Sequence, residues 1–275
     1  MKHLEIARTL GLEEQLQLGQ ILFEDFDTVE LCELIKKMNF SFKKEKSIQR
    51  KWEKHLLSHD KDFDGSLGSI FDMYKYKKTI LRIKFRKAKF SQFLGTQEDR
   101  PLRINLRKFP MDKEICLPLS IGAIAITNPT PDHPKGCMLF AERAKTAFDE
   151  NAMTLLPGGY FDPNKDFFIG ENEKNLERKY SIVLTLLREL FEETGIILSN
   201  VKINYLGMIY NSYGSKQPLI ACYINIPYPD KLIMDKETKR IYFVDNDIEA
   251  VKEFIKGKKL AWHDALKLIL YFNKM

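Results

Sequence analysis

Three carboxylates stand close together between Arg188 and Ile196, where the sequence reads R-E-L-F-E-E-T-G-I. Glu189, Glu192 and Glu193 occupy positions i, i+3 and i+4, so a helix would place them on one face. Carboxylates at this spacing repel each other by roughly 0.2–0.5 kcal/mol per pair at a solvated surface. A divalent cation such as Mg²⁺, which takes oxygen ligands and binds through few carboxylates plus substrate phosphates, would offset the repulsion. The alternative is a solvated acidic face with Arg188 as its counter-charge.

The segments before these carboxylates predict how they are held. Residues 181–190 form an apolar run without proline or glycine, which predicts a helix packed on a core, and Gly195 is suited to end it. Upstream, the sequence L-L-P-G-G-Y over residues 155–160 predicts a strand end that turns at Gly158 and Gly159. Paired glycines allow a sharp turn or a close approach of the backbone to another group.

This order of a Gly-Gly turn, an apolar helix and R-E-x-x-E-E-x-G-I resembles the Nudix hydrolase family. The family's box reads G-x5-E-x7-R-E-U-x-E-E-x-G-U, where U is aliphatic, and residues 188–196 match every fixed position of its second half. The first half departs from the pattern, because Gly159 and Arg188 lie about fifteen residues further apart than in the family. We therefore expect an insertion over residues 162–179, which are polar and charged.

The first glutamate of the box has no counterpart at the expected places. Lys165 stands there when the spacing is counted from Gly159, and Tyr180 stands there when it is counted back from Arg188. Two acidic residues of the insertion are open as replacements, Glu173 and Glu177. That glutamate is mainly structural in the family, so its loss leaves metal binding plausible.

The resemblance implies an α/β fold, the Nudix α-β-α sandwich with a central mixed sheet. It also implies attack of water on one phosphorus of a diphosphate, with Mg²⁺ as the cofactor and Mn²⁺ as an alternative. The metal ligands it implies are Glu189, Glu192 and Glu193. One of them, or a glutamate elsewhere, would be the general base, and Arg188 would orient the carboxylates. Gly158 and Gly159 would shape a loop that brings a backbone carbonyl to the metal.

Three further residues are candidates for substrate contacts. Arg143 ends a strand expected over residues 136–143, where either a diphosphate contact or a surface ion pair is equally plausible. Tyr210 and Tyr213 lie at and after the end of a strand expected over residues 201–210. Either tyrosine could stack on a nucleobase, although such residues more often pack structurally.

The N-terminal part carries a second resemblance. A helix over residues 47–58 carries Trp52 and has Ser47 as its N-cap, and a hairpin follows over residues 70–76 and 79–85. With the later F-x-x-F-L-G-T, this is similar to the N-terminal extension of animal UDP-glucose and UDP-galactose diphosphatases and their plant relatives. We expect an α+β domain over residues 1–112 and a Nudix domain over 113–275. The substrate would be a UDP-sugar; ADP-ribose, NADH, dinucleoside polyphosphates and non-catalytic nucleotide binding are the alternatives.

The remaining core elements follow from apolar patterns. The nearly continuous apolar run over residues 117–127 predicts a strand covered on both faces. Further strands are expected over residues 219–226 and 241–244, and helices over 247–255 and 262–272. Phe40 and Phe42 flank another possible strand.

Composition limits the function classes. The 275 residues are 44% apolar and 30% charged, with no apolar run near the length of about 18 residues that a membrane span needs. The four cysteines are scattered singly, which indicates buried thiols in a reducing compartment, so we expect a cytoplasmic protein. The net charge of +6 is diffuse, and no nucleic-acid reader motif accompanies it. A small-molecule nucleoside diphosphate is the expected partner, and nothing in the sequence indicates an oligomeric state.

Overall fold

A mixed sheet of eight strands forms the centre of the protein. The computed structural model describes residues 2–34, 41–57, 64–97, 104, 106, 115–144, 151–172, 175–211 and 217–275. The strands run β1-β11-β12-β5-β6-β13, with β7 beside β6 and β8 beside β5. Their bounds are β1 Gly19–Phe23, β5 Ser120–Thr127, β6 Cys137–Arg143, β7 Met153–Leu155, β8 Gly158–Tyr160, β11 Asn204–Asn211, β12 Pro218–Ile226 and β13 Thr238–Asp245. The β12–β5 pair is parallel and its described neighbours pair antiparallel, which confirms the mixed sheet.

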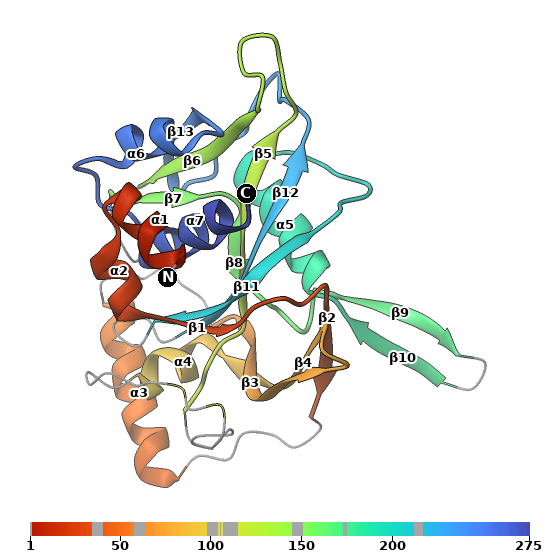
Figure 1. Cartoon of the computed structure of the whole chain (residues 1–275). Coiled ribbons are helices and arrows are strands. Elements are labelled where there is room, and N and C mark those ends of the chain that lie inside the picture. Colours follow the sequence, from red (N-terminus) through yellow and green to blue (C-terminus); the bar gives the residue numbers. More distant parts are fainter. Residues whose placement is uncertain are drawn as a thin grey trace.

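Helices cover both faces of this sheet (Figure 1). Along β5, Ile121 and Ala123 belong to one core cluster while Ile124 and Ile126 belong to the other. The alternation follows from the two-residue period of a strand and confirms the prediction of a doubly covered strand. Helix α5 (Ile182–Thr194) lies on the first face, and α1 (Lys2–Leu10), α6 (Ile248–Ile255) and α7 (Trp262–Lys274) lie on the second, with α2 (Glu13–Leu18) beside them.

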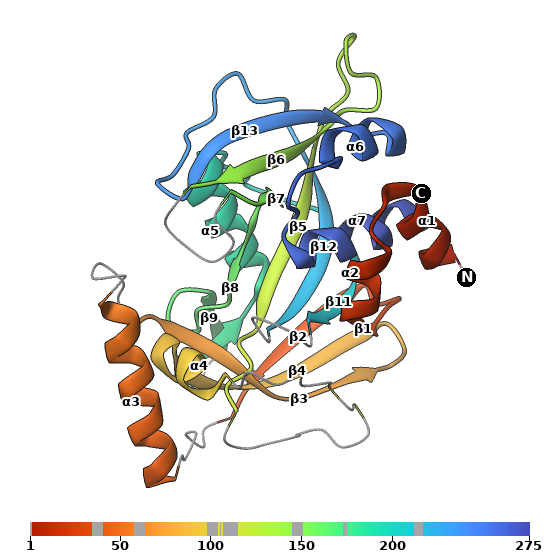
Figure 2. The same ribbon diagram turned by 90° about the vertical axis from the view of Figure 1, so that its left-hand side faces the viewer.

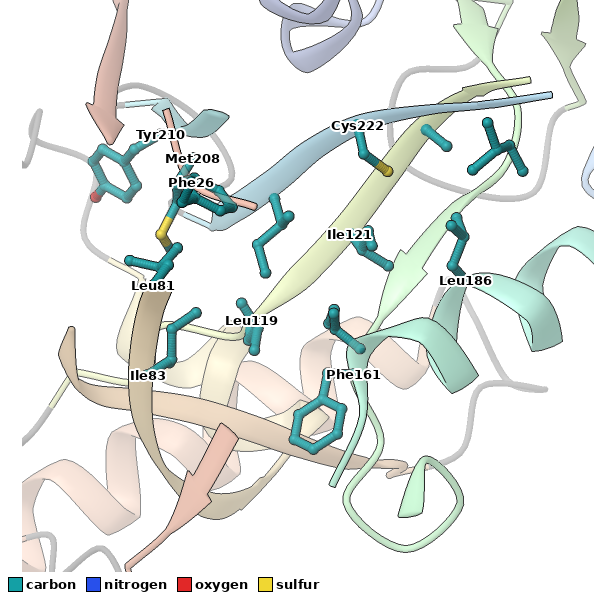
Figure 3. Packing of buried hydrophobic residues seen from close by; sticks show 14 of the residues in the cluster. Phe26, Leu81, Ile83, Leu119, Ile121, Phe161, Leu186, Met208, Tyr210 and Cys222 are labelled. Atoms are coloured by element: carbon teal, nitrogen blue, oxygen red, sulfur yellow. The ribbon is translucent and has the colours of Figure 1, made fainter. Parts of the chain in front are cut away.

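A second sheet of three strands packs on the α5 face. Its order is β2-β4-β3, formed by β2 Thr28–Glu33, β3 Ser66–Tyr76 and β4 Ile80–Lys89. The β3–β4 pairing confirms the predicted hairpin. Side chains of this sheet such as Leu81 and Ile83 share one core with Leu119, Ile121 and Phe161 (Figure 3). The backbones also join, since Ile70 N donates to Leu117 O at 2.8 Å.

Two helices flank the small sheet, α3 (Phe42–Leu56) and α4 (Phe90–Thr96) (Figure 2). Helix α3 begins earlier than predicted, because Ser41 rather than Ser47 is its N-cap and its Oγ accepts from Lys44 N at 3.4 Å. Phe42 therefore starts a helix, and the strand expected there is wrong. Trp52 is partly exposed, not a core residue; its ring contacts His55 and Phe90.

The first residues of the chain pack with the central sheet and the helices on its second face. Strand β1 pairs antiparallel with β11, and apolar residues of α1 share a core cluster with α7. The division into domains 1–112 and 113–275 stays a prediction, although residues 19–23 form an edge strand of the central sheet. No helix in the described ranges is long and apolar enough to cross a membrane. The four cysteines are free thiols, and Cys116, Cys137 and Cys222 are buried.

Candidate active site

Helix α5 carries the three carboxylates, as predicted. It begins after Ser181 and ends at Gly195, whose φ of 74° places it in the left-handed region that glycine adopts readily. Its buried side is apolar, and Ile182, Leu186 and Leu190 pack into the core between the two sheets. Burial of this stripe fixes the rotation of the helix and so decides where the carboxylates point.

Strand β8 (Gly158–Tyr160), called the Gly-Gly strand below, lies directly against two of the carboxylates. Gly158 N donates to Glu193 Oε2 at 3.1 Å. A Cβ built on Gly159 would lie 2.0 Å from the carboxyl carbon of Glu189 and within 2.5 Å of both its oxygens. At Gly158 the nearest atom to such a Cβ is Ile121 O at 3.5 Å, an ordinary contact. Gly159 is therefore required for space, whereas Gly158 contributes a backbone N–H that other residues also carry.

The position of β8 depends on a split in the central sheet. Strand β8 pairs with β5 while β7 pairs with β6, so the chain crosses from one strand to the other at residues 156–157. The fully buried Lys267 of α7 bridges the split, because its Nζ donates to Ala123 O at 3.2 Å and to Leu155 O at 3.5 Å. Its Nζ also lies 2.6 Å from Oδ1 of the fully buried Asp264, whose Oδ2 accepts from Thr154 Oγ1 at 2.7 Å.

The charge of Asp264 is stabilised by its neighbours. Burial alone would raise the pKa of this carboxyl group, but the charges of His263 and Lys267 and the hydrogen bonds from Lys267 and Thr154 lower it below its ordinary value. The hydrogen bonds of Lys267 and Asp264 tie α7 to β5 and β7 just before the Gly-Gly strand.

Arg188 is held by a buried acid that the sequence reasoning missed. Asp166 is 1% exposed and receives two hydrogen bonds from Arg188, Nε to Oδ1 at 3.0 Å and Nη2 to Oδ2 at 3.0 Å. Asp166 Oδ2 also accepts from Thr185 Oγ1 and from Asp162 N, each at 2.8 Å. Such a bidentate pair fixes the plane of the guanidinium group.

Asp166 comes directly after Lys165. Lys165 stands where the first glutamate of the box is expected when the spacing is counted from Gly159. The signal available in the sequence was therefore an acidic residue one position after the place expected for that glutamate. Glu173 and the side chain of Glu177, the two replacements considered above, lie outside the described part of the chain.

The remaining donors of Arg188 reach the site itself. Nη1 donates to Glu189 Oε1 at 2.6 Å and to Glu192 Oε2 at 3.4 Å, and Nη2 donates to Tyr160 O at 3.0 Å. Arg188 thus joins the end of the Gly-Gly strand to two of the carboxylates. The orienting role that the family resemblance implies stays a prediction.

Two of the three glutamates, Glu189 and Glu193, sit in an environment that disfavours their negative charge. Burial raises the pKa of Glu189 to about 7, although Arg188 opposes the shift. Burial and the nearby charge of Glu189 raise the pKa of Glu193 well above its ordinary value. The side chain of Glu192 is 49% exposed. Glu193 accepts a hydrogen bond from Gly158 N, while Glu189 and Glu192 share Nη1 of Arg188 as their donor.

Arg143 lies near the carboxylates at the end of β6. Burial raises the pKa of Glu193 and of Tyr160, and the positive charge of Arg143 lowers both pKa values in part. Arg143 also pairs with Glu237, at 3.5 Å from Nη2 to Oε2. The expected ion pair is therefore present, and the contact of Arg143 with a diphosphate stays a prediction.

Tyr210 does not reach the site. The ring is fully buried and packs in the core between the two sheets, where it lies beside Met208 and Phe26 and far from Leu186 of α5 (Figure 3). A side chain without exposed surface cannot stack on a bound base, so the prediction of a base-stacking role for Tyr210 is wrong. Tyr213 lies outside the described residues, and its role stays a prediction.

The expected insertion contains a β-hairpin that the sequence reasoning did not predict. Strands β9 (Phe167–Asn172) and β10 (Asn175–Tyr180) pair antiparallel and project from the body of the protein (Figure 1). Tyr180 anchors its base, with ring contacts at 5.0 Å to Phe85 and 6.1 Å to Phe161. An open pocket of about 510 Å³ separates this base from α5; it is lined by Lys165, Asp166, Phe167, Leu184, Leu187, Arg188, Phe191, Ile197 and Leu198.

Comparison with known proteins gives weak likenesses only. No family model and no curated protein matches the chain. The MutT protein from Methanosarcina mazei Go1 is similar in structure, with 16% identity and a TM-score of 0.38 over 57% of this chain and 91% of that one. The NUDIX domain of Shewanella oneidensis NrtR, solved with ADP ribose, has 16% identity and a TM-score of 0.42 over 62% of this chain and 94% of that one. A C. elegans Ap4A hydrolase has 16% identity and a TM-score of 0.35 over 57% of this chain and 98% of that one. At these values the likenesses establish neither the family nor the activity.

Proposed function

We propose that this protein is a metal-dependent Nudix hydrolase that cleaves the diphosphate of a nucleoside-diphosphate sugar. The substrate would be of the UDP-glucose or UDP-galactose type, and the products would be the nucleoside monophosphate and the sugar 1-phosphate. One observation carries the proposal: the Gly158–Gly159 strand lies against Glu189 and Glu193, while Arg188 is held in place by Asp166. The sequence motif and this arrangement support the same site.

The donor set suits a hard divalent cation. Glu189 and Glu193 are neighbouring carboxylates whose pKa values are raised by burial, and the backbone of Gly159 passes close to the carboxyl group of Glu189. We propose Mg²⁺, with Mn²⁺ as an alternative, since both favour oxygen ligands. Glu192 could join the set by giving up its contact with Arg188. When bound, the metal would polarise the phosphoryl oxygens and lower the pKa of a water molecule.

The chain's own residues would prepare the site for this chemistry. The N–H of Gly158 holds Glu193, and Arg188 orients Glu189 through its 2.6 Å hydrogen bond. Arg143 places a positive charge beside the carboxylates, where it could contact the diphosphate. One of the glutamates, or another acid, would accept the proton of the attacking water.

The UDP-sugar assignment depends on the N-terminal segment. Residues 90–96, which read F-S-Q-F-L-G-T, form α4, and the rings of Phe90 and Phe93 lie 6.2 and 6.0 Å from that of Tyr160 at the end of the Gly-Gly strand. The segment that carries the second resemblance therefore contacts the strand that forms the site. The free thiols agree with the cytoplasmic location we propose.

The test is hydrolysis of a substrate panel with Mg²⁺ or with chelator. UDP-glucose, UDP-galactose, ADP-ribose, NADH and diadenosine polyphosphates are compared on the wild type, Glu193→Gln and the control Glu253→Gln, whose side chain is 78% exposed on α6. We expect metal-dependent cleavage of the UDP-sugars that falls at least about 100-fold in Glu193→Gln and is unchanged in the control. Cleavage of adenine compounds alone would retain the hydrolase and refute the UDP-sugar preference. Binding without turnover across the panel would favour a non-catalytic module.

A further inference from the structure

A second group of metal-ligating side chains lies at the other end of β6 from Arg143. His133 in the β5–β6 loop, Cys137 at the start of β6 and Asp245 at the end of β13 each offer one ligand atom, and these atoms lie within 4.8 Å of one another. His133 Nδ1 lies 2.6 Å from Asp245 Oδ1, and Cys137 Sγ lies 3.7 Å from the same oxygen. The group combines an imidazole, a thiol and a carboxylate from three segments.

Backbone hydrogen bonds hold the loop that presents two of these side chains. Within the turn, His133 N donates to Thr130 O at 3.1 Å and Gly136 N donates to His133 O at 2.9 Å. Gly136 has a φ of 73°, and a Cβ there would lie 2.1 Å from Thr127 O, so the turn requires glycine. Cys137 N then donates to Thr127 Oγ1 at 2.9 Å. The fold therefore sets the backbone positions of His133 and Cys137 before any ligand binds.

Contacts from other segments hold the group from its remaining sides. Asn246 N, next to Asp245, donates to Gly136 O at 3.0 Å. The ring of Tyr228 lies parallel to that of His133, with 6.3 Å between centroids and 9° between planes. A ligand set on rigid elements with supported rotamers is the arrangement that metal sites use.

We infer that His133, Cys137 and Asp245 bind one Zn²⁺ ion, separate from the magnesium site proposed above. These three ligand types are those of protein zinc sites, whereas Mg²⁺ does not select thiols. Tetrahedral bonds of about 2.3 Å to sulfur and about 2.1 Å to oxygen place those two atoms about 3.6 Å apart. The observed 3.7 Å from Sγ to Oδ1 fits this separation without rearrangement.

The imidazole and the carboxylate must move apart on binding. Zinc bonds of about 2.1 Å place nitrogen and oxygen about 3.4 Å apart, compared with 2.6 Å in this structure. The side chains of His133 and Asp245 are 32% and 55% exposed, so both have room to rotate. As the Zn–S bond forms, the Cys137 thiol releases its proton to solvent. Water would complete four-fold coordination, and the ion would tie the β5–β6 loop to the end of β13.

Cobalt(II) absorption tests the inference, because a thiolate bound to Co²⁺ gives a charge-transfer band that carboxylate sites lack. The full chain, freed of any histidine tag, is titrated with Co²⁺ and then with Zn²⁺. We expect one thiolate-bound Co²⁺ per chain, displaced by Zn²⁺, with the band lost in Cys137→Ser. His133→Ala and Asp245→Asn should each weaken binding by about 100-fold or more, since changes around zinc ligands already cost about 10–100-fold.

Two matched controls separate this site from the rest of the protein. Cys32→Ser removes a thiol on β2, and Glu193→Gln alters the proposed magnesium site; both should retain the band. Absence of the band in the folded wild type, or its persistence in Cys137→Ser, would overturn the inference, leaving a His133–Asp245 ion pair beside an inert thiol. If Cys137→Ser does not fold, the near-isosteric and exposed Asp245→Asn carries the test.

Discussion

Replacing Gly159 with alanine tests how closely the Gly-Gly strand must approach the carboxylates. An alanine Cβ at this position would lie 2.0 Å from the carboxyl carbon of Glu189 and 2.1 Å from Oε1. Ordinary contacts begin near 3.4 Å, so the carboxyl carbon must retreat by about 1.4 Å or the strand must shift. The N–H of Gly158 still donates to Glu193 in the unperturbed geometry. The variant therefore displaces one carboxylate in particular.

The displacement should be costly for catalysis and modest for folding. Misplacement of a reacting group by about 1 Å can cost about 100-fold in rate. Moving Glu189 also disturbs its 2.6 Å hydrogen bond from Arg188, which orients it. The folded state loses little apolar contact, because Glu189 can rotate toward solvent at about 0.5–1.5 kcal/mol for a strained rotamer. We expect kcat/KM to fall about 100-fold while the protein remains folded.

Gly158→Ala is the matched control, since a Cβ there meets Ile121 O at an ordinary 3.5 Å. Hydrolysis of the best substrate from the panel is measured for both variants, and Mn²⁺ binding is measured by electron paramagnetic resonance, which needs no substrate. We expect Gly159→Ala to lose activity and Mn²⁺ affinity while Gly158→Ala stays within a few-fold of the wild type. Equal behaviour of the two variants would refute the steric reasoning, whether both were active or both impaired.

Three further substitutions test other parts of the structure. Asp166→Ala removes the bidentate partner of the half-buried Arg188, and we expect a loss of about 3–5 kcal/mol in urea unfolding together with lower activity at constant fold. Lys267→Met leaves the Asp264 carboxylate buried without its cation and should cost about 3–5 kcal/mol, most of which the double variant with Asp264→Leu should recover. Because the folded pKa of Asp264 is lowered, its contribution to stability is present above its unfolded value near 3.8 and is lost as the pH falls through the folded pKa; acid titration of the double variant should lack this loss. Tyr210→Phe should leave KM unchanged and alter stability by less than about 1 kcal/mol, since its buried hydroxyl has no hydrogen-bond partner among the described residues; a raised KM would instead show that the hydroxyl contacts the substrate.

Elements with a strong local signal could be predicted from the sequence. Helix α5 combines an apolar stripe with Gly195 as its C-cap, and its observed end agrees with the prediction. The β3–β4 hairpin and β5 were equally clear, because alternation and continuous apolar runs report burial directly. The start of α3 was less so: Ser41 and Ser47 are both possible N-caps, and the lysine-rich segment between them has little apolar pattern.

The partners of the site residues could not be predicted, because they depend on long-range folding. Asp166 meets Arg188 because β9 and β10 pair with each other, which brings positions 22 residues apart into contact. Tyr210 shares a face of β11 with Met208, and the sequence does not reveal whether that face meets the core or a ligand. Lys267 would ordinarily be read as a surface residue, and its burial follows from the split between β5 and β7.

Charge balance supports the proposal of a divalent cation at this site. The single guanidinium group of Arg188 is shared by Asp166, Glu189 and Glu192, so it cannot neutralise all three. Its best geometry goes to Asp166, which receives two of its hydrogen bonds. The buried Glu189 and Glu193 therefore retain raised pKa values, which means that the folded chain favours a positive charge between them. Protons can supply that charge in the free protein, and Mg²⁺ would supply it by displacing them, so metal affinity should rise with pH through the range in which these two carboxyl groups ionise.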